Sequence, residues 1–184
     1  TTVYCSITGF GAAGRHAQRA GHDLNYAGWA GVLEPTAPAL PPVQVADFAA
    51  GALGAVTEIL AALVERARTG RGARLVVSMT HGTHRPASRA PVLTSGFACY
   101  RMYETADGRH LTVAALEPKF FARLCELLGR SELVARQYDT DQEALVSELA
   151  ASFRHRTLEE WLHVFEREDA CVGPVATLAE AEAD

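Results

Sequence analysis

Apolar residues along the first eighty positions follow two different periods. The short β-prone run Val3–Thr8 ends at Gly9, and Arg74–Met79 is a second run of this kind, so both predict strands. Between them, Asp23–Val32 predicts a short helix and residues 47–68 predict a long one. Strands separated by helices along the chain are typical of part of an α/β layer.

The long helix is predicted to begin at Asp47, because Asp is a good N-cap residue, and to end at Gly70. Its stretch Phe48–Val64 is the most apolar of the chain, but Glu58 interrupts it. It falls short of the roughly 18 clean apolar residues of a membrane span. We therefore expect a buried helix and no membrane span. Four prolines in residues 34–42 predict an extended connection before it.

The second half of the chain has a different pattern. Residues 100–115 alternate in character about an Asp107-Gly108 turn, which predicts a β-hairpin. Helices are expected next over Pro118–Leu128, Glu143–Phe153 and Leu158–Glu166. Thr157 and Glu160 form a capping-box sequence at the start of the last helix.

These elements predict an α/β protein in two parts. Residues 1–79 would belong to a larger α/β domain, and residues 96–184 would form a small α+β domain with the hairpin and the helices. The segment 80–95 would link them, since residues 80–89 are polar and rich in His and Arg and predict a loop.

Composition narrows the class of protein. Hydrophobic residues make up 48% of the 184 residues and charged residues 21%, which is typical of a globular protein. The net charge is −5 and no long basic stripe occurs, so we expect no nucleic-acid partner. The four cysteines lack CxxC spacing and predict reduced thiols in a cytoplasmic protein.

Two motifs suggest ligands at first sight. The segment Gly9–Gly14 fits G-x-G-x-x-G, but only six residues separate Gly14 from Gly21, too few for the crossover helix of a dinucleotide site. A glycine-rich turn is the better interpretation. His81 and His84 lack a carboxylate or Cys partner at suitable spacing, so no metal site is expected.

Three titratable residues stand at the starts of predicted helices: His22, Asp47 and Glu117. The free N–H groups at a helix start favour an ionised carboxylate and a neutral imidazole, and both are suited to general-base chemistry. Each residue taken singly is also explained as a helix cap or as an exposed side chain. The sequence pattern does not show whether the three converge in space.

The motifs around these residues resemble a known family. Gly21-His22-Asp23-Leu24-Asn25-Tyr26 is similar to the G-H-D-[LI]-N-Y motif of α-methylacyl-CoA racemases, a branch of the family III (CaiB/BaiF) CoA-transferases. Further matching segments occur in the family's order at Tyr4–Gly11, Ala46–Phe48, Tyr103–Arg109, Ala115–Phe120 and Asp169–Val175.

The resemblance implies an isomerase that removes the proton α to an acyl-CoA thioester and returns it to either face through an enolate. By motif, His22 with Glu117 would act on one face and Asp47 on the other. Asp23 and Tyr26 would line the thioester end of the CoA site. The substrate itself carries the CoA, so no separate cofactor is implied, and the pathway would be lipid metabolism.

The wider family implies two alternatives. Its CoA-transferases use an Asp at the position of Asp47 as a nucleophile that forms an anhydride with the acyl group. The resemblance also implies that the chain matches the middle and C-terminal parts of longer members, which form interlocked homodimers. The segment 80–92 is shorter here than in the family. A third hypothesis is therefore an inactive chain that requires a partner polypeptide.

Overall fold

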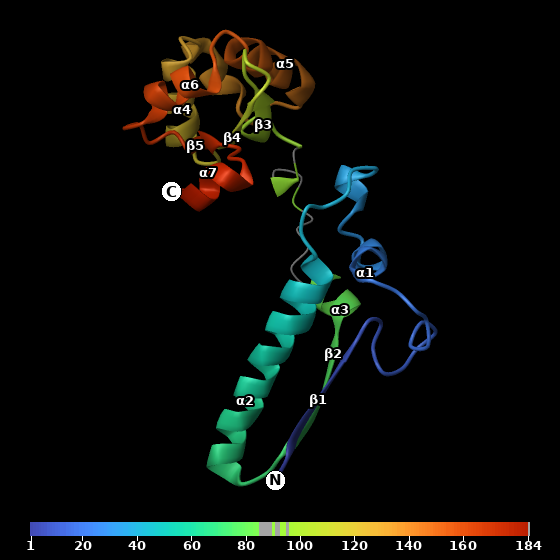
Figure 1. The fold of residues 1–184 in the computed structure, drawn as a ribbon. Coiled ribbons are helices and arrows are strands. Elements are labelled where there is room, and N and C mark those ends of the chain that lie inside the picture. Colours follow the sequence, from blue (N-terminus) through green and yellow to red (C-terminus); the bar gives the residue numbers. More distant parts are fainter. Residues whose placement is uncertain (85–89, 91–92, 95, 184) are drawn as a thin grey trace. The chain divides into compact units, whose positions relative to one another are not determined.

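The computed structural model describes residues 1–84, 90, 93–94 and 96–183 (Figure 1). The chain divides into two compact units, Thr1–Ala87 and Ser88–Asp184, which are considered separately below. The division falls inside the predicted linker 80–95. Residues 85–89, 91–92 and 95 of that segment lie outside the described residues, so the linker stays a prediction.

Two parallel strands form the sheet of the first unit. Strand β1 spans Val3–Thr8 and β2 spans Ala73–Ser78, paired in register from Val3 with Ala73 to Thr8 with Ser78. Both strand predictions are confirmed, the second with a start one residue earlier. Figure 1 shows the ribbon of the two strands running alongside the long helix that connects back to β2. Parallel pairing with helical crossovers is the arrangement of an α/β layer.

The connection between the strands is mostly helical. It contains α1 (Asp23–Ala30), the 3₁₀ turn η1 (Glu34–Thr36), the π-helix η2 (Val45–Leu53) and α2 (Gly54–Thr69). The predicted start of the long helix at Asp47 is wrong. Gln44 is the cap residue, and Asp47 lies in the first helical turn. A nine-residue π-helix is rare, and π segments are frequent at functional sites.

A third helix, α3 (Met79–His84), corrects the loop predicted for residues 80–89. It packs against η2 and α1. Gly82 allows a close approach to η2, because a Cβ atom there would lie 2.8 Å from the Cβ of Ala50. Nδ1 of His84 also lies 2.9 Å from the carbonyl oxygen of Ala30. These tertiary contacts stabilise a helix that local propensity did not indicate.

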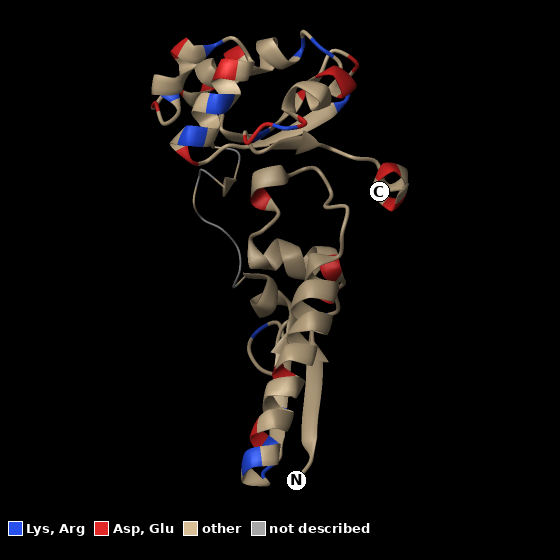
Figure 2. Cartoon of the chain, turned by 90° about the vertical axis from the view of Figure 1, so that its left-hand side faces the viewer, with Lys and Arg blue, Asp and Glu red and all other residues tan. Residues whose placement is uncertain are grey.

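The prediction that Phe48–Val64 forms a buried helix is wrong. Ala55 is 3% exposed, but a stripe of apolar residues is more than half exposed: Leu53, Val56, Leu60 and Val64. Their spacing of three and four residues places them on one face. Figure 2 shows few charged residues along α2: an acidic position part-way along the helix, and a group at its C-terminal end. We refer to these four residues as the outer face of α2.

The helical stretch Val45–Thr69 is long and apolar enough to cross a membrane by length and composition alone. One such helix is weak evidence, because the core helix of a soluble protein passes the same test, although such a helix is mostly buried and this stretch is only 22% buried. One side of α2 packs on β1 and β2, where Ile59 and Leu63 share a hollow with Val3 and Cys5.

The second unit is an α+β fold. Strands β3 (Tyr100–Glu104) and β4 (His110–Ala114) form the predicted antiparallel hairpin, and a third strand that the sequence did not indicate, β5 (Val172–Pro174), pairs with β4. The predicted helices are confirmed with small changes at their ends. The helical elements are α4 (Pro118–Leu127), η4 (Ser131–Arg136), α5 (Gln142–Phe153), α6 (Leu158–Phe165) and α7 (Leu178–Ala183).

Aromatic residues fill the core of the second unit. The ring of Phe153 lies 5.0 Å from Tyr103 and 5.5 Å from Trp161. Nε1 of Trp161 donates to the carbonyl of Phe153 at 2.8 Å, so the indole is buried with its donor satisfied. The capping box of Thr157 and Glu160 is confirmed. This core fixes the strand β4 that precedes Glu117.

Candidate active site

The segments after β1 and β2 meet at the carboxyl end of the two strands. The hydroxyl of Thr8 donates to the carbonyl of Val77 at 3.1 Å and accepts from the amide of Gly11 at 3.0 Å. Thr80 donates to the carbonyl of Gly9 through its amide at 3.0 Å and through its hydroxyl at 2.8 Å. In open α/β sheets, ligands bind outside this end of the strands.

The glycine-rich segment is a turn, as the sequence predicted. Gly11 and Gly14 both have φ near +98°, which other residues rarely adopt. The next helix, α1, begins only at Asp23, so no helix start meets the last glycine of the G-x-G-x-x-G match. The structure therefore lacks the geometry of a dinucleotide fingerprint at Gly9–Gly14.

His22 is the N-cap residue of α1. Its backbone is extended, its amide donates to Oδ1 of Asn25 at 3.1 Å, and the amide of Asn25 donates to the carbonyl of His22 at 2.8 Å. Asn25 thus fixes the position of the histidine through the backbone. The residue itself is exposed, so its imidazole is accessible to a ligand.

Asp23 connects α1 to the start of η2. Its side chain is buried, and Oδ1 accepts from the amide of Ala46 at 2.6 Å and from the amide of Asp47 at 2.9 Å. A carboxylate at a helix start is stabilised by free N–H groups and by the helix dipole. The contact holds the backbone of residues 22–23 beside that of residues 46–47. We call this place the Asp23 corner.

Asp47 itself is exposed at this corner, so its carboxylate is accessible like the imidazole of His22. The carboxylate of Asp23 thus links the residue after His22 to the amide of Asp47. The catalytic roles of His22 and Asp47 stay predictions.

Tyr26 is buried under the glycine-rich turn. Its hydroxyl donates to the carbonyl of Gly21, and its ring lies 5.0 Å from Phe10 in an edge-on arrangement. A Cβ atom at Gly9 would lie 2.3 Å from Cε1 of Tyr26. The contacts of Tyr26 shape the turn that leads to His22, and its predicted contact with substrate stays a prediction.

Glu117 belongs to the second unit, where it is the N-cap residue of α4 and is exposed. The carbonyl of the preceding residue, Leu116, accepts from Nε2 of Gln137 at 2.8 Å and from the hydroxyl of Tyr138. Burial raises the pKa of the nearby Cys171 thiol, and the negative charges of Asp169 and Glu117 raise it further. The predicted cap position is confirmed, and the pairing of Glu117 with His22 stays a prediction.

An aromatic and basic cluster near α1 was not singled out from the sequence. The ring of His16 lies 4.2 Å from that of Trp29, and the guanidinium carbons of Arg15 and Arg19 lie 5.9 and 5.8 Å from the indole. Desolvation lowers the pKa of His16, and the positive charges of Arg19 and Arg15 lower it further. The motif R-H-x-x-R in the turn is the signal that could have indicated it.

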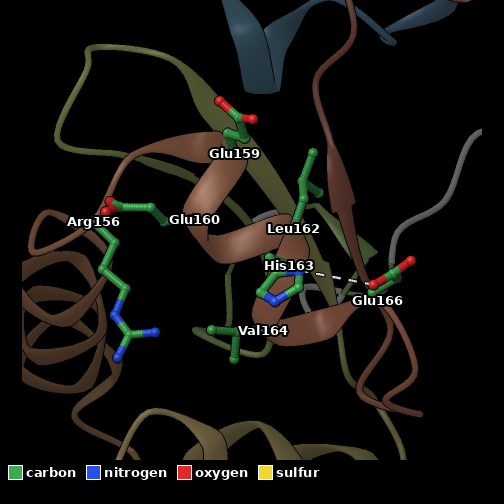
Figure 3. A pocket seen from close by; sticks show the side chains of 7 residues that line it. All are labelled: Arg156, Glu159, Glu160, Leu162, His163, Val164 and Glu166. Atoms are coloured by element: carbon green, nitrogen blue, oxygen red, sulfur yellow. Dashed lines mark ion pairs between the residues drawn. The ribbon is translucent and has the colours of Figure 1, made fainter.

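A hollow on α6 in the second unit contains none of the predicted site residues. It is lined by Arg156, Leu162 and His163 among others, and His163 forms a 3.8 Å ion pair with Glu166 (Figure 3). These side chains stand on an exposed helix surface. Within the part of the chain that the structure describes, no group of three His, Cys, Asp or Glu residues could hold a metal ion.

Comparison with known proteins places these features in context. The family model for CoA-transferase family III matches residues 1–184. The chain is 35% identical to the alpha-methylacyl-CoA racemase of Mus musculus, a match over 97% of this chain and 53% of the mouse protein. It is 28% identical to the succinyl-CoA:glutarate CoA-transferase of Homo sapiens, over 94% of this chain and 45% of that protein.

A solved structure has the same fold. The crystal structure of a CaiB/BaiF family protein from Brucella suis superposes with a TM-score of 0.73 at 28% identity, over 99% of this chain and 55% of that chain. The chain spans about half the length of the relatives that it matches.

Proposed function

The chain belongs to CoA-transferase family III, and we propose that it provides the proton-transfer groups of an acyl-CoA racemase. The reaction would remove the α-proton of a 2-methylacyl-CoA thioester and return it to either face of the resulting enolate. This reaction needs a base on each side of the α-carbon and no cofactor beyond the CoA of the substrate.

The Asp23 corner is the observation that supports this proposal most directly. Two hydrogen bonds from the start of η2 to one buried carboxylate hold the amide of Asp47 against the side chain of Asp23, the residue after His22. His22 and Asp47 are both exposed there, at the carboxyl end of the parallel strands. His22 and Asp47, both positioned through Asp23, would fit a mechanism in which one base acts on each face of the α-carbon.

The proposed roles follow from the residue types. In each direction one of His22 and Asp47 would remove the α-proton from one face, and the protonated form of the other would give a proton to the opposite face. Glu117 would orient the imidazole and stabilise its protonated form once it has taken up the proton. N–H groups at a helix start are suited to stabilising an enolate oxygen. Similarity to the mouse racemase supports the class of reaction proposed here.

CoA transfer is the second candidate function, because the chain also resembles a human succinyl-CoA:glutarate CoA-transferase. In that reaction the carboxylate of Asp47 would attack the thioester, form a mixed anhydride and release CoA as a thiolate. The thiolate would attack the Asp47 carbonyl of this anhydride, releasing the first acid and leaving an Asp47–CoA thioester. The carboxylate of the acceptor acid would then displace CoA to form a second anhydride. Attack of the CoA thiolate on the acceptor's acyl carbonyl would form the new thioester and free Asp47. His22 would not be required as a base for this chemistry.

Deuterium exchange distinguishes the two reactions. The chain, alone and co-expressed with the amino-terminal half of a full-length family member, is incubated with (2R)-2-methylacyl-CoA in D₂O. A racemase incorporates deuterium at C2 and forms the 2S epimer, as mass spectrometry and chiral chromatography would detect. Transfer of CoA to added free carboxylic acid without exchange would instead establish the transferase.

Three variants assign the roles. We expect His22→Ala and Asp47→Asn each to lower the exchange rate by roughly 10²- to 10⁴-fold, the usual contribution of a general acid or base. His163→Ala is a matched control, because that imidazole is 87% exposed on α6. An unchanged exchange rate in His22→Ala would remove His22 from the mechanism.

We further propose that the chain acts with additional polypeptide. The outer face of α2 exposes four large apolar side chains, and parallel sheets are normally covered on both sides. A second copy, in an interlocked homodimer, or a separate polypeptide could cover it. Deuterium exchange that appears only on co-expression with the amino-terminal half would support the need for a separate polypeptide. Deuterium exchange by the chain alone would contradict that need.

A further inference from the structure

An apolar cavity of about 380 Å³ lies in the first unit, between the end of α1 and the proline-rich connection. Its lining includes Ala27, Val32, Leu33, Leu40, Pro42 and Val45. Known small-molecule pockets have volumes from roughly 300 to 1,000 Å³. The cavity therefore has room for a small group or a short chain.

None of the described residues that line the cavity is charged. Thr36 is the polar residue among its lining residues, and its hydroxyl donates to the carbonyl of Leu33 at 3.3 Å. The backbone of the connection is also paired, with the amides of Thr36 and Ala37 both donating to the same carbonyl. A polar occupant would lose its hydration without gaining partners here, so an aliphatic occupant is favoured.

The cavity borders the Asp23 corner. Ala27 lies four residues after Asp23, so both project from the same face of α1, one helical turn of about 5.4 Å apart. On the other side, Val45 precedes Asp47 by two residues at the start of η2. A ligand with its reacting carbon at the corner could place a chain attached to that carbon in the cavity.

The geometry points to this cavity as the site that binds the aliphatic chain of a branched, short-chain acyl thioester, an inference that rests on the proposed function. Leu40 is 73% exposed and Val43 is 58% exposed. Both belong to the connection that forms one wall of the cavity, and they offer apolar contacts to carbon atoms beyond its mouth. The cavity would set the preference of the enzyme for chain length.

Methyl NMR tests binding without requiring catalysis. The complete chain, with ¹³C-labelled Val and Leu methyl groups, is titrated with N-acetylcysteamine thioesters of 2-methylbutanoic, 2-methylhexanoic and 2-methyloctanoic acid. These probes lack the nucleotide of CoA. We expect the resonances of Val32, Leu33 and Val45 to shift. The Kd should fall roughly fourfold per added methylene until the cavity is full. Shifts confined to other methyl groups, or a Kd independent of chain length, would overturn the inference.

Substitutions on the connection provide the control. Ala39 lines the cavity, so Ala39→Phe should weaken binding of the longest probe at least tenfold. Ala37 is two residues away and is not a lining residue, so Ala37→Phe should leave this binding unchanged. If Ala39→Phe fails to fold, Leu33→Ala should move the preference toward longer chains. Probe binding without deuterium exchange would refute the proposed function alone. If deuterium exchange is observed but these substitutions change neither probe binding nor chain-length preference, the cavity inference alone would be refuted.

Discussion

Removing the carboxylate of Asp23 should destabilise the start of η2. The variant Asp23→Ala leaves the amides of Ala46 and Asp47 without their acceptor, and Ala46 is completely buried. A hydrogen bond to a charged group contributes about 1.5–3 kcal/mol, and losing an N-cap costs about 0.5–2 kcal/mol. Because both amides share one oxygen and water can reach Asp47, we expect a loss of about 2–4 kcal/mol rather than the full sum.

Two comparison variants separate the contributions. Asp23→Asn keeps an oxygen acceptor and loses the charge, so it should cost about 1 kcal/mol. Asp141→Ala removes an exposed N-cap of α5 that accepts from the amide of Ala144 at 3.2 Å, and should cost about 0.5–1 kcal/mol. Native-state hydrogen exchange is the suitable assay, because it reports the local free energy of opening in each unit separately.

The expected result is a roughly 30- to 1,000-fold faster exchange of the Ala46 amide in Asp23→Ala, with partial recovery in Asp23→Asn. Amides of α5 should be unaffected. Equal exchange at Ala46 in the wild type and in Asp23→Ala would refute the reasoning that this carboxylate anchors η2. If Asp23 acts only by positioning Asp47, Asp23→Ala should lose exchange of the substrate α-hydrogen, and Asp23→Asn should retain most of it.

Three further predictions follow from individual contacts. Gly9→Ala should destabilise the first unit by about 1–3 kcal/mol, because its Cβ would overlap Tyr26, as thermal unfolding can measure. Hydrogen bonds from Arg109, and then from Thr177, lower the pKa of Glu180 from 4.5 to about 2. The contribution of the Arg109–Glu180 ion pair to holding α7 should therefore be fully present above pH 4.5 and be lost as the pH falls through about 2, as NMR of α7 can follow. Leu60→Lys should reduce self-association in analytical ultracentrifugation, because it places a charge on the outer face of α2.

Each of these has a matched control. Gly28→Ala lies within α1, where an added Cβ atom would have its nearest neighbour at 3.9 Å, so it should be neutral or slightly stabilising. An equal loss in both glycine variants would contradict the packing argument. Glu180→Gln should remove the pH dependence of α7, and a persisting transition would assign it to another group. Glu58→Gln changes an exposed charge on α2, so a similar effect on self-association would exclude the apolar contact as the cause.

Local pattern was sufficient for most elements of the fold. The strand Val3–Thr8, the hairpin about Asp107 and Gly108, and the helix ending at Phe153 are formed by short-range signals of period, turn residues and caps. The sequence also placed His22 and Glu117 at helix starts. These features depend on residues within a few positions of one another, so they can be recognised without knowledge of the fold.

Contacts between distant residues accounted for the errors. Helix α3 forms in a polar segment because Gly82 fits against Ala50, 32 residues earlier. The start of η2 lies two residues before Asp47 because Asp23, from another helix, accepts its free amides. The spacing of apolar residues in α2 correctly predicted a helix. Whether each face of that helix is buried depends on which other segments pack against it, and the spacing does not specify those segments.

Residue type and short spacing were enough to predict the order of most elements and the positions of His22, Asp47 and Glu117 at helix starts, and the resemblance of ordered motifs to a known family identified the family. Only the folded chain shows that Asp23 joins the starts of α1 and η2, and that an apolar cavity borders this corner. Such proximity arises from hydrogen bonds and packing between segments more than twenty residues apart. The pattern of residues along the chain does not indicate which of these segments lie close together in the fold.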